Sequence, residues 1–156
     1  MNWEAIGAVG EILGAIAVVL SLAYLAVQIK NQNKEARLST MHDISVGFRE
    51  ALAKFATEDM SKISIQANAD FDELTDDEAM RFVATFGGLF RAWEEAFIQH
   101  DEGRLDKRSW DVMSRYYLLA LSAGGAKRAW ALRKDYLDAE FVKYVDQLTL
   151  TEYKIR

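Results

Sequence analysis

Apolar residues dominate the first thirty positions of the chain. From Ala5 to Val27 the sequence runs through twenty-three residues with a single charged side chain, Glu11. A helix needs roughly twenty apolar residues, at about 1.5 Å of rise each, to cross a hydrocarbon core of about 30 Å. The pattern therefore predicts a transmembrane helix, with residues 1–29 as the anchor and residues 30–156 as a separate domain.

Two other interpretations fit a long apolar segment near the N-terminus. A secretory signal peptide has a basic leading segment and a small-residue cleavage site, whereas this segment begins with Glu4 and offers only Ser21-Leu22-Ala23. A helix buried in the core of a globular domain is the second alternative. We favour a retained span, because the apolar run has the length of a bilayer and no cation precedes it.

Basic residues flank only one side of this span. Lys30, Lys34 and Arg37 follow it, and no Lys or Arg precedes it. Cytoplasmic flanks of membrane helices carry an excess of such residues. The N-terminus is therefore expected outside the membrane and the following domain in the cytoplasm, while Trp3 and Tyr24 suit the two membrane interfaces.

Small residues recur at steps of three and four within the span. They are Gly7, Gly10, Gly14, Ala17 and Ser21. On a helix these positions share one face, where small side chains let another helix approach closely. No second apolar span is present in the sequence, so the expected partner is another copy of the chain. The pattern predicts a homo-oligomer, the alternative being incidental composition.

The candidate pore or intramembrane polar residues are Glu11 and, near the inner end of the span, Gln28. A carboxylate in hydrocarbon costs on the order of 2–3 kcal/mol at the bilayer centre, so it usually faces protein or water. In a homo-oligomer Glu11 would form a ring of carboxylates, an arrangement that selects cations in pores. The alternative, favoured by there being one acidic residue per subunit, is that Glu11 reaches the outer surface or bonds to a neighbouring helix near the positive end of its own helix.

The composition favours helices throughout. The chain contains no proline, the residue that most strongly breaks helices. It also contains no cysteine, which excludes disulfides and thiolate sites. Alternating β-branched residues are scarce, so the predicted fold class is all-α. A net charge of −5 argues against nucleic acid as a partner, because nucleic acid requires a basic face.

The domain from residue 30 is expected to be a helical bundle. The first helix is expected to continue to about Ala56 and to be followed by a loop over 57–74 that contains one helical turn. Its expected buried face consists of Leu38, Met41, Ile44, Phe48, Leu52 and Phe55. Thr75 and Glu78 have the spacing of a capping box for the next helix, whose core-facing stripe is Phe82, Phe86, Leu89, Phe90, Trp93 and Phe97.

Glycines mark the later boundaries. Gly87-Gly88 inside the aromatic helix suggests the close approach of another helix. Gly103 is expected to end that helix, and Gly124-Gly125 to stop a helix over 107–122 that Asp106 caps. Two further helices are expected over 126–135 and 139–150.

No pattern of catalytic, cofactor-binding or metal-binding residues stands out. His42 and His100 are the only histidines, and neither belongs to a Glu-x-x-His pair. Glu95 and His100 lie five positions apart and diverge around a helix. No Gly-rich turn follows a strand to hold phosphate. We therefore expect no enzyme activity, no cofactor and no metal.

Several motifs resemble those of an uncharacterised family of small bacterial inner-membrane proteins. They are Trp3-Glu4-Ala5-Ile6-Gly7-Ala8-Val9-Gly10-Glu11 with Tyr24-Leu25-Ala26-Val27-Gln28-Ile29, Trp93-Glu94, Gly103-x-Leu105-Asp106 with Trp110, and Gly125-x-x-Arg128-x-Trp130 with Phe141-x-x-Tyr144-Val145-Asp146. Ala129 stands where the family pattern has a second tryptophan. The resemblance implies one N-terminal span, a helical cytoplasmic domain and a bacterial inner membrane, with no activity to carry over.

The sequence thus predicts a single-pass protein of the inner membrane. It is expected to self-associate through the small-residue face in the lipid bilayer and to present a cytoplasmic helical domain for interaction or scaffolding. The alternative is a homo-oligomeric cation channel with a Glu11 ring and a cytoplasmic gate or vestibule. A membrane-tethered enzyme is the third hypothesis.

Overall fold

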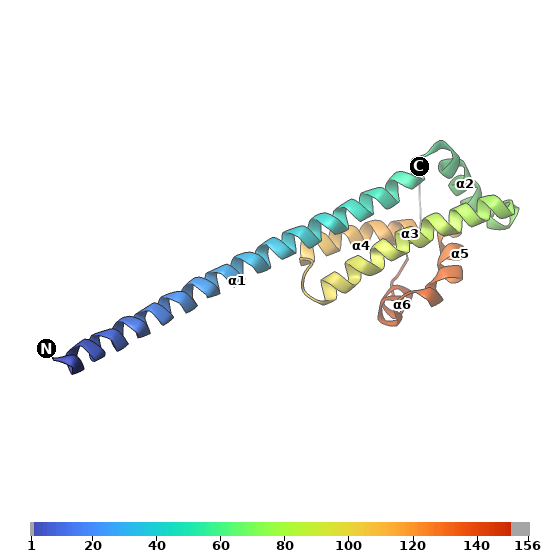
Figure 1. Ribbon diagram of the computed structural model, residues 1–156. Helices are drawn as coiled ribbons and strands as arrows, with labels where there is room; N and C mark the ends of the chain where they lie inside the picture. The colour runs from blue at the N-terminus through green and yellow to red at the C-terminus, as the bar shows by residue number, and fades with distance from the viewer. Residues whose placement is uncertain (1, 151–156) are drawn as a thin grey trace. The chain divides into compact units, whose positions relative to one another are not determined.

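The computed structural model describes residues 2–150, and within this range it contains helices but no strand (Figure 1). The predicted all-α fold class is confirmed. Two compact units are distinguished, one ending at Ser39 and the other beginning at Thr40. The helices are α1 (Trp3–Phe55), α2 (Glu58–Ala69), η1 (Phe71–Glu73), α3 (Asp76–Asp101), α4 (Lys107–Leu121), α5 (Gly124–Arg133), η2 (Lys134–Tyr136) and α6 (Ala139–Asp146).

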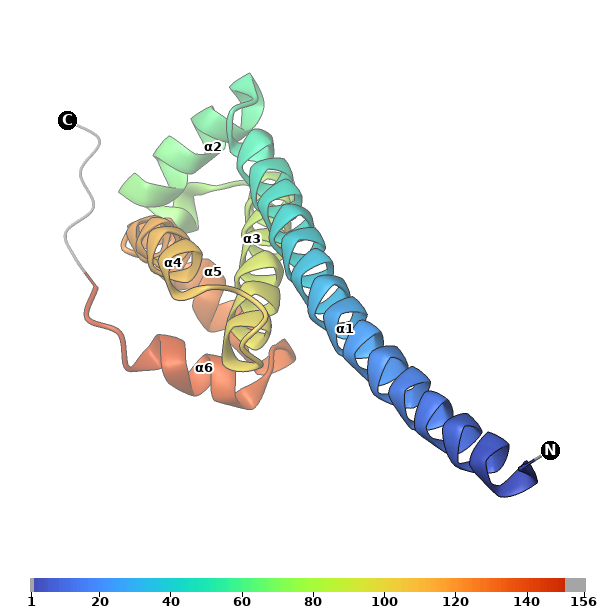
Figure 2. The same cartoon turned by 90° about the vertical axis from the view of Figure 1, so that its left-hand side faces the viewer.

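The aromatic stripe of α3 forms the centre of the second unit. Helix α3 contacts α2, α4, α5 and α6 (Figure 2). Its stripe is buried as predicted, with Phe97 partly so. Trp93 stacks on Tyr117 of α4, with ring centroids 5.1 Å apart, and meets Phe141 of α6 edge to face at 5.5 Å. Such aromatic pairs add to the free energy gained by burying their area.

The last turns of α1 also belong to this core, although its expected buried face is shorter than predicted. Ile44 is buried, and Phe48, Leu52 and Phe55 pack partly buried against the core. Phe55 meets Phe86 with ring centroids 4.8 Å apart. Leu38 and Met41, the first two residues of the predicted face, are exposed instead.

The helix ends follow the predicted capping chemistry. Thr75 and Glu78 form a capping box, in which the Thr75 hydroxyl accepts from the Glu78 N–H and the Glu78 carboxylate accepts from the Thr75 N–H. The hydrogen bonds that the Glu78 carboxylate accepts from the Thr75 N–H and from the Thr75 hydroxyl hold the pKa of Glu78 below its usual value. Asp106 caps α4 by accepting from Ser109, and Gly103 has a φ of 71°, a conformation that glycine adopts without strain.

Residues 57–74, expected as a loop, mostly form helix α2. The Thr57 hydroxyl caps this helix by accepting from the Met60 N–H. Met60, Ile63 and Ala67 recur at helical steps and are buried. The polar residues around them conceal this short apolar face in the sequence, which is why the prediction was wrong.

Gly124-Gly125 was expected to stop a helix, but α4 already ends at Leu121 and the glycine pair begins α5. The N-cap residue of α5, Ala123, has no side chain that can cap. Asn68 of α2 replaces it, because its Oδ1 accepts from the Gly125 N–H at 3.1 Å. The start of α5 therefore depends on a residue 57 positions earlier.

The close helix approach that Gly87-Gly88 suggested occurs at Gly125 instead. A Cβ atom at Gly125 would lie 2.9 Å from the Cβ and carbonyl oxygen of Ala67 and from Cζ of Phe82. At Gly87 and Gly88 it would meet only the ends of the Arg133 and Lys54 side chains, 4.0 and 3.9 Å away. The contact between α2 and α5 thus requires the absence of a side chain, whereas α3 has room for one.

Two acceptor carboxylates hold the C-terminal helices in place. Glu94 is 6% exposed, and its oxygens accept from Arg91 at 2.6 Å and from the Asp138 N–H at 2.5 Å. Asp146 accepts from the Trp130 indole N–H and from Lys134, both at 2.8 Å. The Lys134 hydrogen bond, followed by that of Trp130, lowers the pKa of Asp146 below its usual value.

Replacing Gly125 by alanine is expected to destabilise the second unit by about 1–3 kcal/mol, because the added methyl group overpacks a rigid crossing. Gly87→Ala is the matched control, and it is expected to stabilise the protein by up to about 1 kcal/mol through helix propensity. Urea unfolding of the full chain in detergent, followed by tryptophan fluorescence, measures both. Equal effects of the two substitutions would contradict the close approach at Gly125.

Asp146→Asn is expected to make the free energy of unfolding depend less on pH in the acid range. A carboxyl whose folded pKa is depressed stabilises the fold above its unfolded pKa of about 3.9, and this contribution disappears as the pH falls through the folded value. The variant should be less stable than the wild type at pH 7, by no more than about 1 kcal/mol because the Asp146 side chain is 42% exposed. The difference should vanish near pH 2.

The measurement is the urea midpoint between pH 2 and pH 7, with Asp135→Asn as the control. Some acid dependence should remain in the Asp146 variant, because hydrogen bonds also lower the pKa of Glu78 and Asp106. A stability difference that stays constant across this pH range would show that Asp146 acts through packing alone.

Candidate functional site

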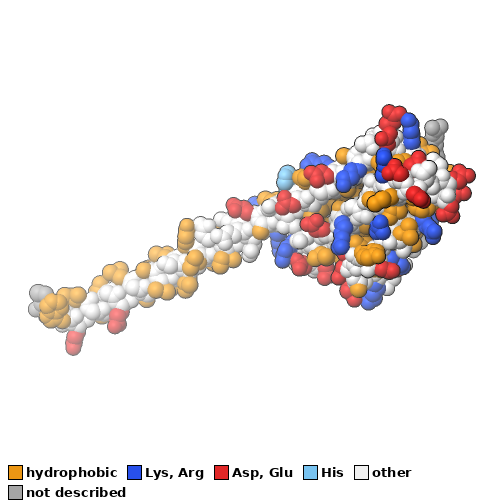
Figure 3. All heavy atoms as spheres, turned by 45° about the vertical axis from the view of Figure 1, so that its right-hand side comes forward, with side chains coloured by type: hydrophobic (Ala, Val, Ile, Leu, Met, Phe, Trp, Pro, Cys, Tyr) orange, Lys and Arg blue, Asp and Glu red, His pale blue; other side chains and the backbone are white. Residues whose placement is uncertain are grey.

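The apolar part of α1 is exposed along its length. An 18-residue window of this helix has a mean hydropathy of 2.4, and none of it is buried. Fourteen large hydrophobic side chains between Trp3 and Ile29 are exposed, among them Leu13 at 61% and Val19 at 65%. Figure 3 shows hydrophobic side chains along this part of α1, and charged side chains interspersed with hydrophobic ones over the visible face of the second unit. Among residues 2–150 there is therefore one helix, near the N-terminus, that is long and apolar enough to cross a membrane.

The five small residues predicted as an interface all lie on one face of this helix. They are Gly7, Gly10, Gly14, Ala17 and Ser21, and all are exposed. A Cβ atom added at any of the three glycines would find no atom within 4 Å. The Ser21 hydroxyl donates to the Ala17 carbonyl at 2.8 Å, which satisfies the hydroxyl within its own helix. The face is narrow and free of charged groups.

Glu11 and Gln28, the candidate polar residues of the span, are not brought together. They lie seventeen residues apart, which corresponds to about 25 Å along a helix. Gln28 is half-buried and donates to the Tyr24 hydroxyl at 3.0 Å. Glu11 is exposed and makes no ion pair within the described residues. By helical geometry it lies beside the small-residue face, about 90° from its centre.

The two histidines lie in unrelated surroundings. His42 is exposed on α1. His100 stacks on Trp110 with ring centroids 4.9 Å apart, and its Nδ1 lies 3.3 Å from the Leu105 carbonyl oxygen. No group of three or more His, Asp or Glu side chains among residues 2–150 is arranged to hold a metal ion.

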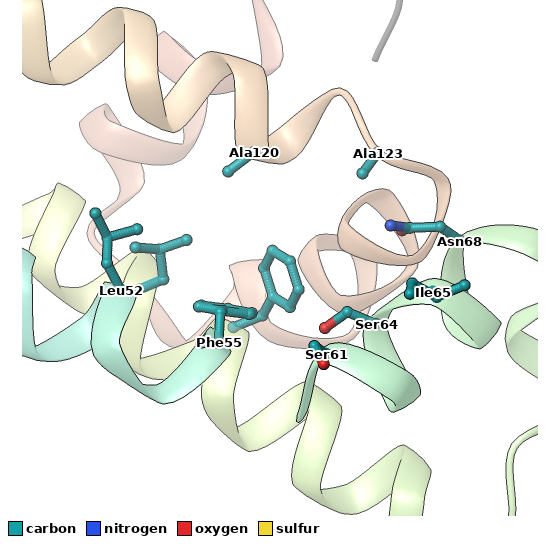
Figure 4. A pocket seen from close by; sticks show the side chains of 10 residues that line it. Leu52, Phe55, Ser61, Ser64, Ile65, Asn68, Ala120 and Ala123 are labelled. Carbon is teal, nitrogen blue, oxygen red and sulfur yellow. The ribbon is translucent and has the colours of Figure 1, made fainter. Parts of the chain in front are cut away.

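A pocket of about 320 Å³ opens in the second unit, between the last turn of α1, helices α2 and α3, and the end of α4. Figure 4 shows Leu52 and Phe55 along one side and Ser61, Ser64 and Asn68 of α2 along another. None of its lining residues is charged. This volume is at the lower end of the range for small-molecule sites, about 300–1,000 Å³.

The pocket contains a hydroxyl group without a partner. Ser64 Oγ is buried and makes no hydrogen bond within the described residues, a situation that costs about 1–3 kcal/mol. Sequence reasoning missed this site because it assigned residues 57–74 to a loop. Ser61, Ser64 and Asn68 recur at steps of three and four, and this spacing is the signal that could have placed them on one face of a helix.

Comparisons with protein-family models, with curated proteins and with solved structures find no match for this chain.

Proposed function

We propose that the chain is a single-pass membrane protein whose N-terminal helix spans the bacterial inner membrane. The observation that carries this proposal is the complete exposure of the apolar part of α1. Full burial of one Val, Leu or Ile side chain contributes about 1.5–3 kcal/mol, so leaving the twelve such side chains of this segment in water at 51–65% exposure costs on the order of 10–20 kcal/mol. A hydrocarbon environment removes this cost, while the helix satisfies its own backbone hydrogen bonds.

The basic residues after the apolar segment support an orientation with the N-terminus outside. Lys30, Lys34 and Arg37 are exposed on α1. Positive charges of this kind are retained on the cytoplasmic side. The second unit then lies in the cytoplasm. The resemblance to small bacterial inner-membrane proteins supports the same topology.

The narrow face of small residues supports self-association of the spanning helices. In lipid, helices associate through close packing rather than through a hydrophobic driving force, because lipid tails are as apolar as leucine. Gly7, Gly10 and Gly14 leave backbone accessible over two turns, with no other atom within 4 Å of their added Cβ positions. A second copy of the chain is the partner that offers the matching face.

The second unit is proposed to be an interaction or scaffold module. Val112, Tyr116 and Leu119 lie at helical steps on α4, and their side chains are 54%, 50% and 43% exposed. An exposed apolar stripe on a well-packed domain is typical of a surface that binds another protein. The cytoplasmic domain would thus bring a bound protein to the membrane.

Membrane topology can be tested with single cysteines, because the chain has no cysteine of its own. Asn2→Cys and Asn33→Cys are a matched pair on either side of the span. We expect a membrane-impermeant maleimide to label Cys at position 2 in intact spheroplasts, and Cys at position 33 only after permeabilisation. Recovery of the protein in the soluble fraction, or labelling of both sites in intact spheroplasts, would overturn the proposed anchor.

Self-association can be tested by cross-linking within the membrane. Ser21→Cys lies on the small-residue face and Val19→Cys on the opposite side of α1, so an oxidant should form disulfide-linked dimers of the first variant only. Adding Gly10→Leu should reduce this dimer at least several-fold, because the larger side chain separates the backbones. Adding Ala15→Leu, which lies away from the face, should leave it unchanged. Equal cross-linking from positions 19 and 21 would exclude the proposed face.

A further inference from the structure

We propose that the pocket of the second unit binds an uncharged acyl compound, namely a carbonyl group carrying a single alkyl chain of about eight carbons. This proposal does not depend on the membrane anchor, because every lining residue belongs to the unit that begins at Thr40.

The size of the pocket limits how much of a ligand it can hold, and it suits a small molecule. A dry engineered cavity of 150 Å³ accepts benzene, which has six carbon atoms. By proportion, the pocket of about 320 Å³ accepts about a dozen non-hydrogen atoms. A medium-length alkyl chain with one small head group has this size, whereas a whole phospholipid is several times larger.

The walls of the pocket favour an alkyl chain. Leu52 and Phe55 of α1 and Phe86 and Leu89 of α3 provide the apolar side. Phe86 and Leu89 are buried, while Leu52 and Phe55 pack only partly buried against the core. An alkyl chain placed against Leu52 and Phe55 would complete the burial of these two side chains. Since no Lys, Arg or His lines the pocket, a carboxylate in it would remain without a counter-charge.

The α2 side of the pocket favours a carbonyl group. Ser64 Oγ is a buried donor with no partner in the described structure, and Figure 4 shows its hydroxyl extending from α2 toward Phe55. Asn68 lies one turn further along the helix. Its Oδ1 accepts from Gly125, which leaves the Nδ2 group as a donor, and this end of the side chain points toward Ala123 in Figure 4. The Ser64 hydroxyl can donate to a lone pair of a carbonyl oxygen, and the Asn68 amide offers a second donor on the same wall of the pocket.

A photoreactive ligand tests the proposal in the full chain. The probe is the methyl ester of octanoic acid carrying a diazirine on its alkyl chain, added to the protein in lipid nanodiscs. After irradiation, mass spectrometry locates the adducts. Peptides from α2 and α3 should be labelled in a saturable manner, whereas label on residues 6–28 should rise linearly and report simple partitioning into lipid.

Competition defines the ligand chemistry. Unlabelled methyl octanoate should displace the label from α2 and α3, and octanoate should require at least about ten-fold more. Equal competition by octanoate would overturn the uncharged character of the ligand. Saturable labelling of α2 and α3 that occurs in detergent but not in the phospholipid nanodiscs would show that lipid occupies the pocket, and it would overturn the proposal that a small free compound does.

Three substitutions separate binding from folding. Ala120→Leu fills the pocket and should abolish saturable labelling, while Ala84→Leu, on the exposed surface of α3, should leave it unchanged. Ser64→Ala should weaken binding about five-fold, the effect of one neutral hydrogen bond, without lowering the urea midpoint. Unchanged saturable labelling in both Ala120→Leu and Ser64→Ala would overturn the proposal, and so would the absence of saturable labelling in the wild type.

Discussion

The aromatic ridge of α3 is the contact on which the second unit depends. A single amphipathic helix cannot bury a stripe of this size alone, so the other helices of the unit are arranged by what they place against it. Tyr117, Trp130 and Phe141 come from three different helices, and each ring lies within about 6 Å of an aromatic ring on α3. Rings that interdigitate in this way fix the position of each helix along α3, because close-packed interiors resist changes in shape.

The first unit has the opposite property. Its side chains are as apolar as those of the core, yet no part of the described chain covers them. The same hydrophobic effect that drives the second unit to close around α3 therefore has to be satisfied for α1 by something other than the chain itself. Lipid and a second helix are the two surroundings proposed for this helix, in which Glu11 is the one charged side chain between Ala5 and Val27.

Local signals in the sequence were sufficient for much of the fold. The capping box at Thr75, the Asp106 cap and the aromatic periodicity of α3 depend on residues within one or two turns, and all were predicted correctly. The residues of the candidate interface on α1 could also be named from the sequence, because residues three and four positions apart share a helix face.

The errors arose where tertiary contacts decide the local structure. The start of α5 depends on Asn68, which is distant in sequence, and no local rule connects that amide to Gly125. Helix α2 was missed because only three of its twelve residues are buried. The pocket could not be anticipated without α2, since its polar side consists of residues from that helix. Likewise, the hydrogen bonds from the Asp138 N–H to Glu94 and from Trp130 to Asp146 become visible only when the helices are placed.

The crossing of α2 and α5 restricts how this sequence can diverge. Any side chain larger than hydrogen at position 125 would clash with the backbone carbonyl oxygen of Ala67, which no substitution at position 67 removes. Glycine at position 67 would relieve only the contact with its Cβ atom, and it would weaken the interior of α2. Position 125 is therefore expected to remain glycine in descendants of this chain, and the ring of Phe82 adds to the constraint because it closes the third side of the contact.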